Sequence, residues 1–230
     1  MLSYESLIEE ARLRKMPHTK VRGILREYLQ ILILKELYKI EEGRRLYFTG
    51  GTYLRLVHGL KRFSEDLDFN ATLLTKPGFE KLMSRLKDEL KRAGIKSRIT
   101  FNHWGNVYVA KLIFPEIEKL YNVVSKYSKK QGIMIKLEAN KLKIDINTET
   151  NVISGFGEFY PCICTDRGIL FADKIDALGK KKRGRHIYDV MFMLSNKYPV
   201  DRKFLSGLGI REGPLEALSG RIAGLSKEQL

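Results

Sequence analysis

The chain has 230 residues, of which 43% are hydrophobic and 30% are charged, so it can bury the core of one large domain or two small ones. No apolar run reaches the roughly 18 residues that a membrane span needs, and Glu5, Glu9 and Glu10 are unlike a secretory signal. Lys and Arg number 42 against 27 acidic residues, a formal net charge of +15. This one-sided excess favours RNA or DNA as a partner, because a surface of ion pairs would need both signs.

The two cysteines, Cys162 and Cys164, are too close together in the sequence to staple the fold. Without a Cys or His cluster nearby they also form a poor zinc site. A reducing cytoplasm is therefore the expected compartment.

The first half of the chain alternates between helical and extended patterns. Apolar residues recur with the 3.6-residue period of a helix between Val21 and Tyr38, after Pro17 and before Gly43. Farther along, a glycine pair separates a short strand from a short helix. In chain order the predicted elements are a helix over 21–38, a strand over 46–49, a helix over 52–58, a strand over 66–69, a helix over 79–93, and strands over 95–101 and 106–114.

In the second half, alternation over 133–139 and 142–146 predicts two consecutive strands that turn at Asn140. Glycine and serine predict a loop over 148–160, and the pattern is helical from Thr165 on. The other predicted elements are a weakly patterned helix over 115–130, helices over 169–178 and 187–194 with a basic segment over 179–185 between them, and short helices after Pro199. The pattern predicts an α+β fold: a mixed sheet flanked by helices over residues 1–164, then a helical part over 165–230.

Two carboxylates in the predicted strand 66–69 carry the clearest chemistry. In an extended strand Asp66 and Asp68 point to the same face, while Leu67 points to the other. Adjacent carboxylates can hold Mg²⁺ (or Mn²⁺) against the phosphates of a nucleotide. An isolated Asp-x-Asp is often only a solvated strand face, so the pair alone is a weak signal.

A glycine pair precedes these aspartates and raises the specificity of the signal. Gly50 and Gly51 would let the backbone approach a phosphate closely, and Thr52 would add a hydroxyl there. A lone glycine pair is usually a turn, but the order strand, glycine turn, helix, strand with two aspartates favours a nucleotidyltransferase. In such an enzyme, positioning and electrostatic stabilisation of the phosphates supply most of the catalysis.

Two stretches of the chain resemble a known family. The first runs from Thr49 to Leu56 and continues from Arg62 to Phe69 as Arg-Phe-Ser-Glu-Asp-Leu-Asp-Phe. The second is Phe-Ala-Asp-Lys-Ile-Asp-Ala-Leu over 171–178, followed by Gly-Arg-His-Ile-Tyr-Asp-Val over 184–190. Both are similar to the signature of the AbiEii/AbiGii-type nucleotidyltransferase toxins, within the polymerase-β-like nucleotidyltransferase superfamily. The resemblance spans roughly residues 44 to 195.

The resemblance implies a role for individual residues and for the helical part 165–230, which would complete the active site of the core 1–164. Without it, Lys174 and Asp189 would be interpreted as a pair on a helix surface. The implied roles are metal binding by Asp66 and Asp68, contacts to the triphosphate of an NTP by Gly50, Gly51, Thr52 and Ser64, neutralisation of phosphates by Lys174, completion of the site by Asp189, and supporting phosphate or RNA contacts from Arg55 and Arg62.

The third carboxylate expected of the superfamily has two candidates. Glu138 resembles the family's strand better, and Asp145 fits equally well by pattern, on the polar face of the predicted strand 142–146. Either could act as metal ligand or as general base for an attacking hydroxyl. The chain also departs from the family's pattern at His186, where an acid is common, and at Thr52, where many relatives have serine.

Candidate RNA contacts lie in two basic segments, 126–136 and 180–185, and in the aromatic residues Tyr121, Tyr127 and Trp104. Each segment could equally be a solvated run of charge, and each aromatic residue could belong to the core.

The sequence thus predicts a metal-dependent nucleotidyltransferase that moves a nucleoside monophosphate from an NTP to an RNA acceptor. The resemblance implies the 3′ end of tRNA as acceptor and a toxin paired with an antitoxin protein. One alternative is nucleotidylation or phosphorylation of a protein acceptor, and another is a non-enzymatic RNA-binding protein on a degenerate scaffold. The sequence does not decide whether ATP, GTP or CTP is preferred.

Overall fold

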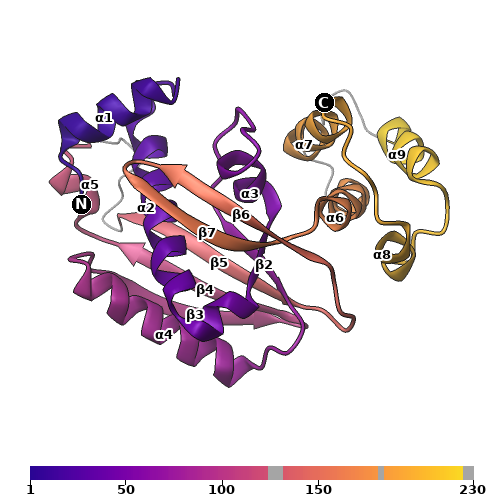
Figure 1. Cartoon of the computed structure of the whole chain (residues 1–230), viewed down its shortest axis with the longest axis horizontal. Helices are drawn as coiled ribbons and strands as arrows, with labels where there is room; N and C mark the ends of the chain where they lie inside the picture. The colour runs from indigo at the N-terminus through magenta and orange to yellow at the C-terminus, as the bar shows by residue number, and fades with distance from the viewer. Residues whose placement is uncertain (124–131, 181–183, 225–230) are drawn as a thin grey trace. The chain divides into compact units, whose positions relative to one another are not determined.

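The computed structural model describes residues 1–123, 132–180 and 184–224, and within them seven strands form one mixed sheet (Figure 1). The order across the sheet is β3-β4-β5-β2-β1-β7-β6. The strands are β1 (Tyr47–Thr49), β2 (Leu67–Ala71), β3 (Arg98–Trp104), β4 (Val107–Phe114), β5 (Ile133–Lys141), β6 (Thr148–Gly155) and β7 (Glu158–Thr165). β2 pairs with β5 and β1 with β7 in parallel, whereas β1–β2, β3–β4 and β4–β5 are antiparallel.

The helices precede, flank and follow the sheet in the sequence. They are α1 (Tyr4–Leu13), α2 (Val21–Lys39), the 3₁₀ helix η1 (Glu41–Arg45), α3 (Gly50–Leu56), α4 (Lys76–Arg92), α5 (Ile117–Leu120), α6 (Arg167–Lys180), α7 (Gly184–Ser195), α8 (Arg202–Gly207) and α9 (Pro214–Ala223). Sheet and helices together confirm the predicted α+β class. No described helix has both the length and the apolar character that crossing a membrane requires.

The chain divides into two compact units. The first comprises Met1–Asp145 and Thr150–Cys164 and holds almost the whole sheet. The second comprises Ile146–Glu149 and the residues from Thr165 on, and is helical. In the second unit α6 packs against α7, α8 and α9.

The core of the first unit lies between the sheet and two helices. In β5 the side chains alternate: Ile133, Ile135 and Leu137 are fully buried, while the residues between them are partly or fully exposed. The buried face of the sheet meets α2 and α4, and the Phe79 ring of α4 stacks on Tyr108 of β4 with centroids 5.9 Å apart. Most residues of helix α2 are buried, and the stretch 31–34 is apolar on all sides. The opposite face of β3, β4 and β5 is the one that carries polar side chains.

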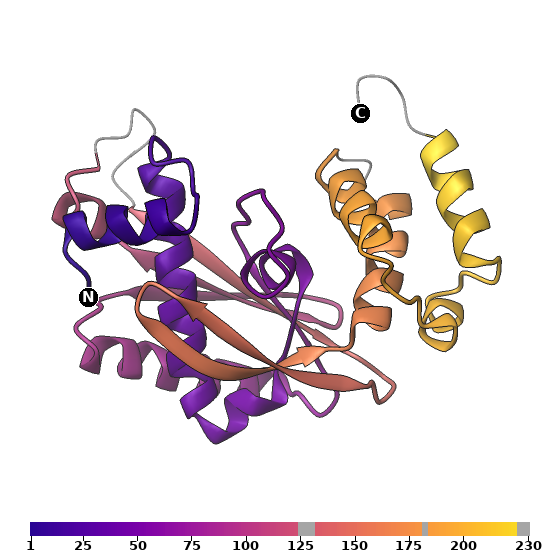
Figure 2. The same cartoon turned by 45° about the horizontal axis from the view of Figure 1, so that its top comes forward.

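Two predictions for the strands were wrong. β5 continues through Asn140 to Lys141 because β2 pairs with it along its whole second half, and the segment 142–146 forms no strand. The segment 148–160, predicted as a loop, contains most of the hairpin β6–β7 (Figure 2). Its turn places Phe156 and Gly157 at positive φ, and β6 reads as a loop because it is an edge strand with mostly polar, exposed side chains.

The helix predictions were mostly confirmed, with two differences. Helix α1 has no counterpart in the prediction, although Ser3 caps it by accepting a hydrogen bond from the backbone of Ser6. Of the helix predicted over 115–130, the described residues show only α5. Residues 124–131, with Lys126 and Tyr127, and residues 181–183 of the basic segment lie outside the described residues.

Candidate active site

Three carboxylates lie on the polar face of the sheet. Asp68 of β2 is in register with Thr49 of β1 on one side and with Glu138 of β5 on the other. Residues opposite one another in neighbouring strands project to the same face, and so do residues two apart along a strand. Asp66, two residues before Asp68, therefore joins the same face. The side chains of Asp66 and Glu138 remain 33% and 29% exposed, so solutes can reach them.

Of the two candidates for the third carboxylate, the structure brings Glu138 and not Asp145 next to Asp68. The prediction that placed Asp145 on the polar face of a strand was wrong, because 142–146 does not pair with the sheet. The register between β2 and β5 ends at Ala71 and Lys141, three residues beyond the level of Asp68 and Glu138. Asp145 lies farther still along the chain and is exposed.

Lys136 lies between two of these carboxylates. Its Nζ is 2.7 Å from Oε1 of Glu138 and 3.4 Å from Oδ2 of Asp66. Burial raises the pKa of Asp66, and the neighbouring Lys136 only partly offsets this rise. Burial lowers the pKa of Lys136, but the hydrogen bond to Glu138 and the charge of Asp66 outweigh it, so the net pKa is raised. The sequence placed Lys136 only at the end of a basic segment, although its i, i+2 spacing to Glu138 would have put both on one strand face.

The glycine pair is required by the side chains that pack against it. Gly50 has φ +81°, and a Cβ there would collide with the carboxylate of Asp68. A Cβ on Gly51 would lie 2.7 Å from Nη2 of Arg62 and 2.9 Å from Oγ of Ser64. The turn therefore brings the backbone next to one carboxylate, one cation and one hydroxyl. This role differs from the predicted one, in which the missing side chains made room for a phosphate.

Two threonines, Thr49 and Thr52, flank this turn. A phosphate contact was predicted for Thr52 alone, but their hydroxyl groups have different surroundings in the structure. Thr52 is fully buried, and its hydroxyl donates a hydrogen bond to the backbone carbonyl of Asp66, so it fixes the entry to β2 and is not placed to hold a phosphate. Thr49 lies in the row with Asp68 and Glu138. Its Oγ1 is buried and has no hydrogen-bond partner among the described residues, which leaves it able to bind a ligand atom.

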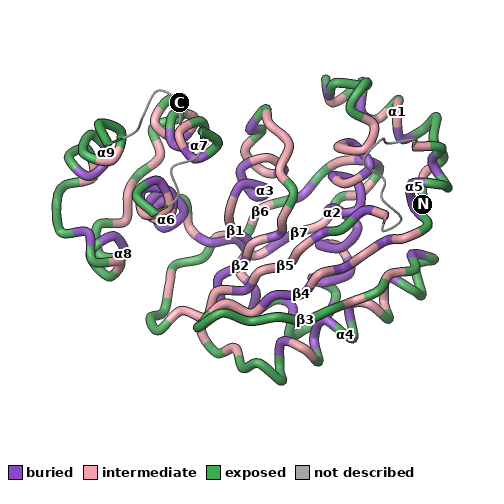
Figure 3. Tube along the Cα trace, turned by 180° about the vertical axis from the view of Figure 1, so that it is seen from behind, coloured by how far each residue is buried: buried purple, intermediate pink, exposed green. Residues whose placement is uncertain are grey.

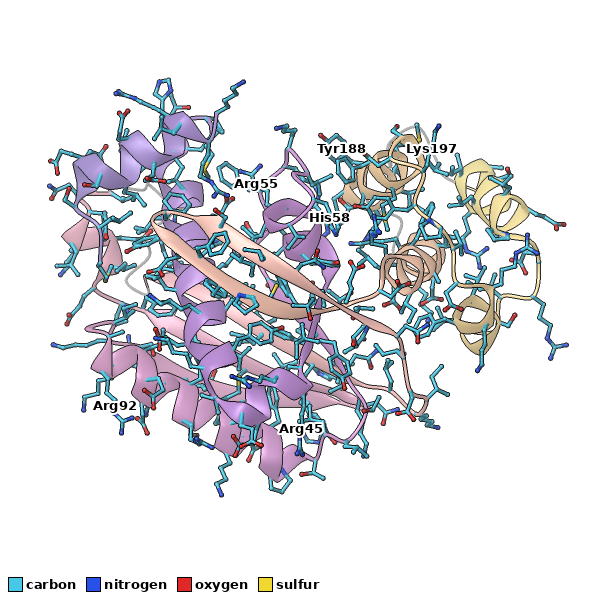
Figure 4. The ribbon with its side chains drawn as sticks, viewed as in Figure 1. Arg45, Arg55, His58, Arg92, Tyr188 and Lys197 are labelled. Atoms are coloured by element: carbon cyan, nitrogen blue, oxygen red, sulfur yellow. The ribbon has the colours of Figure 1, made fainter. Side chains whose placement is uncertain are left out.

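Arg55, predicted as a supporting phosphate or RNA contact, is engaged with groups of the protein itself. Its Nε is 2.8 Å from Oε2 of the buried Glu27, and its Nη1 donates to the carbonyl of Leu60. The guanidinium also lies 5.1 Å from the ring centre of Phe63. Arg55, labelled in Figure 4, thus ties α3 and the following loop to α2.

In the second unit, Lys174 of α6 and Asp189 of α7 form a buried ion pair. Nζ of Lys174 is 2.8 Å from Oδ2 of Asp189, and the side chains are 10% and 0% exposed. The sequence alone favoured a pair on a helix surface, and the structure shows the pair but buries it. Their neighbour Tyr188, labelled in Figure 4, is exposed.

The residues on the polar face suit a divalent cation that arrives with a nucleotide. Among the described residues, no three Asp, Glu, His or Cys side chains converge closely enough to hold a metal ion by themselves. Mg²⁺ is usually held by one or two carboxylates together with phosphate oxygens and water, rather than by a closed protein cage. Asp66 and Asp68 provide such a pair, with the unpartnered hydroxyl of Thr49 beside them.

The pattern of the family described as "Nucleotidyl transferase AbiEii toxin, Type IV TA system" matches residues 32–214. The chain belongs to this family. The matched range contains Asp66, Asp68, Glu138 and the Lys174–Asp189 pair. AbiEii toxins are nucleotidyltransferases, so the glycine turn and the aspartates of β2 lie in a protein of the class that the sequence predicted. Among curated proteins, none matches the chain.

Solved structures share the fold at low sequence identity. The chain is similar to MenT4, a nucleotidyltransferase toxin from Mycobacterium tuberculosis H37Rv, with 17% identity and a TM-score of 0.58, covering 100% of this chain and 77% of that one. A putative nucleotidyltransferase from Helicobacter pylori is similar with 22% identity and a TM-score of 0.51, covering 76% and 68%. JHP933 from Helicobacter pylori is similar with 22% identity and a TM-score of 0.50, covering 76% of this chain and 66% of that one. The chain thus spans about two thirds of the length of the Helicobacter proteins.

Proposed function

We propose that the protein is a metal-dependent enzyme that transfers a nucleoside monophosphate from an NTP to a hydroxyl of RNA, with the 3′ end of tRNA as acceptor. The observation that carries the proposal is the set of Asp66, Asp68 and Glu138 on one sheet face beside the glycine turn. A toxin of this kind would block aminoacylation and would be paired with an antitoxin protein. The cytoplasm, which contains NTPs and tRNA, is the proposed compartment.

Each residue of the face has a part in this proposal. Asp66 and Asp68 hold the divalent cation, which neutralises the phosphates of the NTP and stabilises the charge that develops on them. Glu138 is placed to accept the proton of the attacking hydroxyl, because it shares the register position of Asp68 on the neighbouring strand. Thr49, Ser64 and Arg62 line the turn at which the triphosphate would lie.

The pair in the second unit is proposed to act on the nucleotide. Lys174 would contact phosphate oxygens, and Asp189 would hold its ammonium in place through the 2.8 Å ion pair. This assignment rests on the family's second motif and on the burial of the pair.

An RNA acceptor is supported by the charge of the chain. The formal net charge of +15 gives a field that attracts polyanions and speeds their association. A protein acceptor has no comparable support among the described residues. A purely RNA-binding role is disfavoured because all three carboxylates and the glycine pair are present.

The test is transfer of radiolabel from each of four NTPs, labelled at the α-phosphate, to total tRNA in the presence of Mg²⁺. Wild type is compared with the double variant Asp66→Ala/Asp68→Ala. Label on tRNA that disappears in the double variant supports the proposal and names the nucleotide. Label that appears only on a protein overturns the RNA acceptor, and no label on either substrate overturns the enzymatic proposal.

A further inference from the structure

The polar face of the sheet continues past the carboxylates across two more strands. Glu138 of β5 is in register with Val109 of β4, and Val109 with Asn102 of β3. In the neighbouring row, Lys136 is in register with Lys111. Side chains opposite one another project to the same face, so these residues extend the candidate active site toward the β3 edge.

The β3 edge of this face is open to solvent. Arg98, Thr100, Asn102 and Trp104 are two residues apart, share the polar face and are all exposed (Figure 3). Helix α4 packs against the other face, which carries Tyr108. The edge strand β3 thus presents a cation, an amide, a hydroxyl and an aromatic ring in a single line on this face.

Trp104 is the most informative member of this line. It is the chain's single tryptophan, and 54% of it is exposed. Tryptophan is highly buried on average, and an exposed ring beside polar groups offers a flat apolar surface on which a base can stack. It lies at the end of β3, where the hairpin turns through Gly105 into β4.

We propose that this face of β3, β4 and β5 binds the single-stranded end of the RNA acceptor and leads it to the carboxylates. The inference rests on the proposed function and adds the surface to which the acceptor binds. A base stacks on Trp104, Asn102 and Thr100 donate or accept hydrogen bonds at base edges, and Lys111 and Arg98 contact phosphates. Strands lie about 4.8 Å apart, so β3 is about 14 Å from β2, a span that a few nucleotides cover.

The chemistry of the face favours RNA over a protein partner. A protein interface has a continuous apolar centre, whereas here Val109 and Ile113 of β4 lie opposite Asn102 and Arg98 of β3 and are separated along β4 by Lys111. Cations, amides and one aromatic ring are the groups by which sheet surfaces bind single-stranded nucleic acid without a deep pocket.

The single tryptophan makes binding directly observable. A short single-stranded RNA with a free 3′ hydroxyl should quench the fluorescence of Trp104, both in the wild type and in the inactive variant Asp66→Ala/Asp68→Ala. Trp104→Ala should raise the KM for RNA about fivefold or more, since stacking contributes about 1–3 kcal/mol per base, while leaving the KM for the NTP unchanged. Phe159→Ala is the matched control, because it removes an aromatic ring of β7 that is 77% exposed.

The phosphate contact is tested by salt dependence. Lys111→Met should reduce the slope of log affinity against log salt by about 0.7, the value of one released counterion on a single strand. Arg92→Met, on α4 at the other face, should leave the slope unchanged. If the wild type transfers label to RNA and Trp104→Ala has the same KM for RNA, the proposed RNA-binding surface is wrong, but the proposed function is not contradicted. If the wild type labels protein and not RNA, the proposed function fails and this surface with it.

Discussion

Two groups of charged residues, one in each unit, are built in different ways. On the sheet face Asp66, Asp68 and Glu138 lie together, Lys136 contacts two of them, and the side chains of Asp66 and Glu138 stay partly exposed. In the helical unit the ion pair of Lys174 with Asp189 is almost fully buried.

The sheet face is therefore suited to binding a ligand from solution, whereas the Lys174–Asp189 pair is an interaction within the protein. An excess of carboxylates is tolerated only where water or a cation can reach it, so the sheet face is suited to a metal ion that comes and goes with the nucleotide. A buried pair loses both hydration shells and is kept together by mutual attraction. The first cluster should therefore affect activity with little effect on stability, and the second should affect stability strongly.

The largest effect is expected from Asp68→Asn. The substitution keeps the shape of the side chain and removes the charge that would hold the cation, so the rate of nucleotide transfer should fall on the order of 10³-fold. The melting temperature should stay the same or rise, because carboxylate repulsion is relieved. Asp145→Asn is the control, and equal losses in both variants would contradict the placement of the site on this face.

Lys174→Met should lower the free energy of unfolding by about 3–5 kcal/mol, because it removes one member of a buried ion pair and leaves the buried Asp189 without that countercharge. The double variant Lys174→Met/Asp189→Leu should recover most of this loss in urea denaturation while remaining inactive. Lys180→Met, which breaks the exposed pair with Asp176 on the same helix, should change stability by within about 0.5 kcal/mol. Recovery of activity in the double variant would reduce the pair to a structural role.

Lys136→Met tests whether the ammonium of Lys136 competes with a metal ion for the carboxylates of the sheet face. Removing the ammonium leaves Asp66 and Glu138 without their countercharge, so Mg²⁺ or Mn²⁺ alone should bind about tenfold more tightly. Isothermal titration without nucleotide measures this change, with Lys35→Met as a control for loss of one surface charge. An unchanged or weaker affinity would show that Lys136 supports the cation site rather than competing with it.

The two threonines give the smallest and most specific comparison. Thr52→Val should destabilise the protein by about 1–3 kcal/mol, because the carbonyl of Asp66 loses its buried donor, whereas Thr52→Ser keeps that donor. Thr49→Val removes a hydroxyl that has no partner among the described residues and should cost almost no stability. Denaturation curves and the KM for NTP, measured for both valine variants, distinguish the two threonines. A raised KM is expected for Thr49→Val alone.

The local part of the site was predictable from the sequence, and the long-range part was not. Asp66 and Asp68 could be placed on one face because strand alternation needs only neighbouring residues. The choice between Glu138 and Asp145 depends on where β5 ends, which is decided by pairing with β2 far away in the chain. The position of Lys136 on the face of Glu138 could have been predicted from its i, i+2 spacing, but its contact with Asp66 depends on the pairing of β5 with β2.

Other misses came from partners that no local pattern reveals. The sequence suggests a phosphate contact for Arg55, because its ion pair with Glu27 of α2 joins residues far apart in the chain. β6 was missed because an edge strand can be polar and exposed, and β7, which is held by backbone pairing with β1, was missed with it because the segment 148–160 was predicted as one loop. The long helices α2 and α4 were predicted nearly in full, since their apolar period extends over several turns.

The strand order also decides when, during its synthesis, the protein can first become harmful to the cell. The aspartates emerge from the ribosome early, but β5 follows only after α4, β3, β4 and α5, and β7 later still. Translation proceeds at about 5–20 residues per second, so for several seconds the nascent chain carries Asp66 and Asp68 without Glu138 or Lys136. A ribosome that stalls before residue 133 thus releases a fragment without Glu138 and Lys136, and on the proposed assignment of the site we expect this fragment to be inactive.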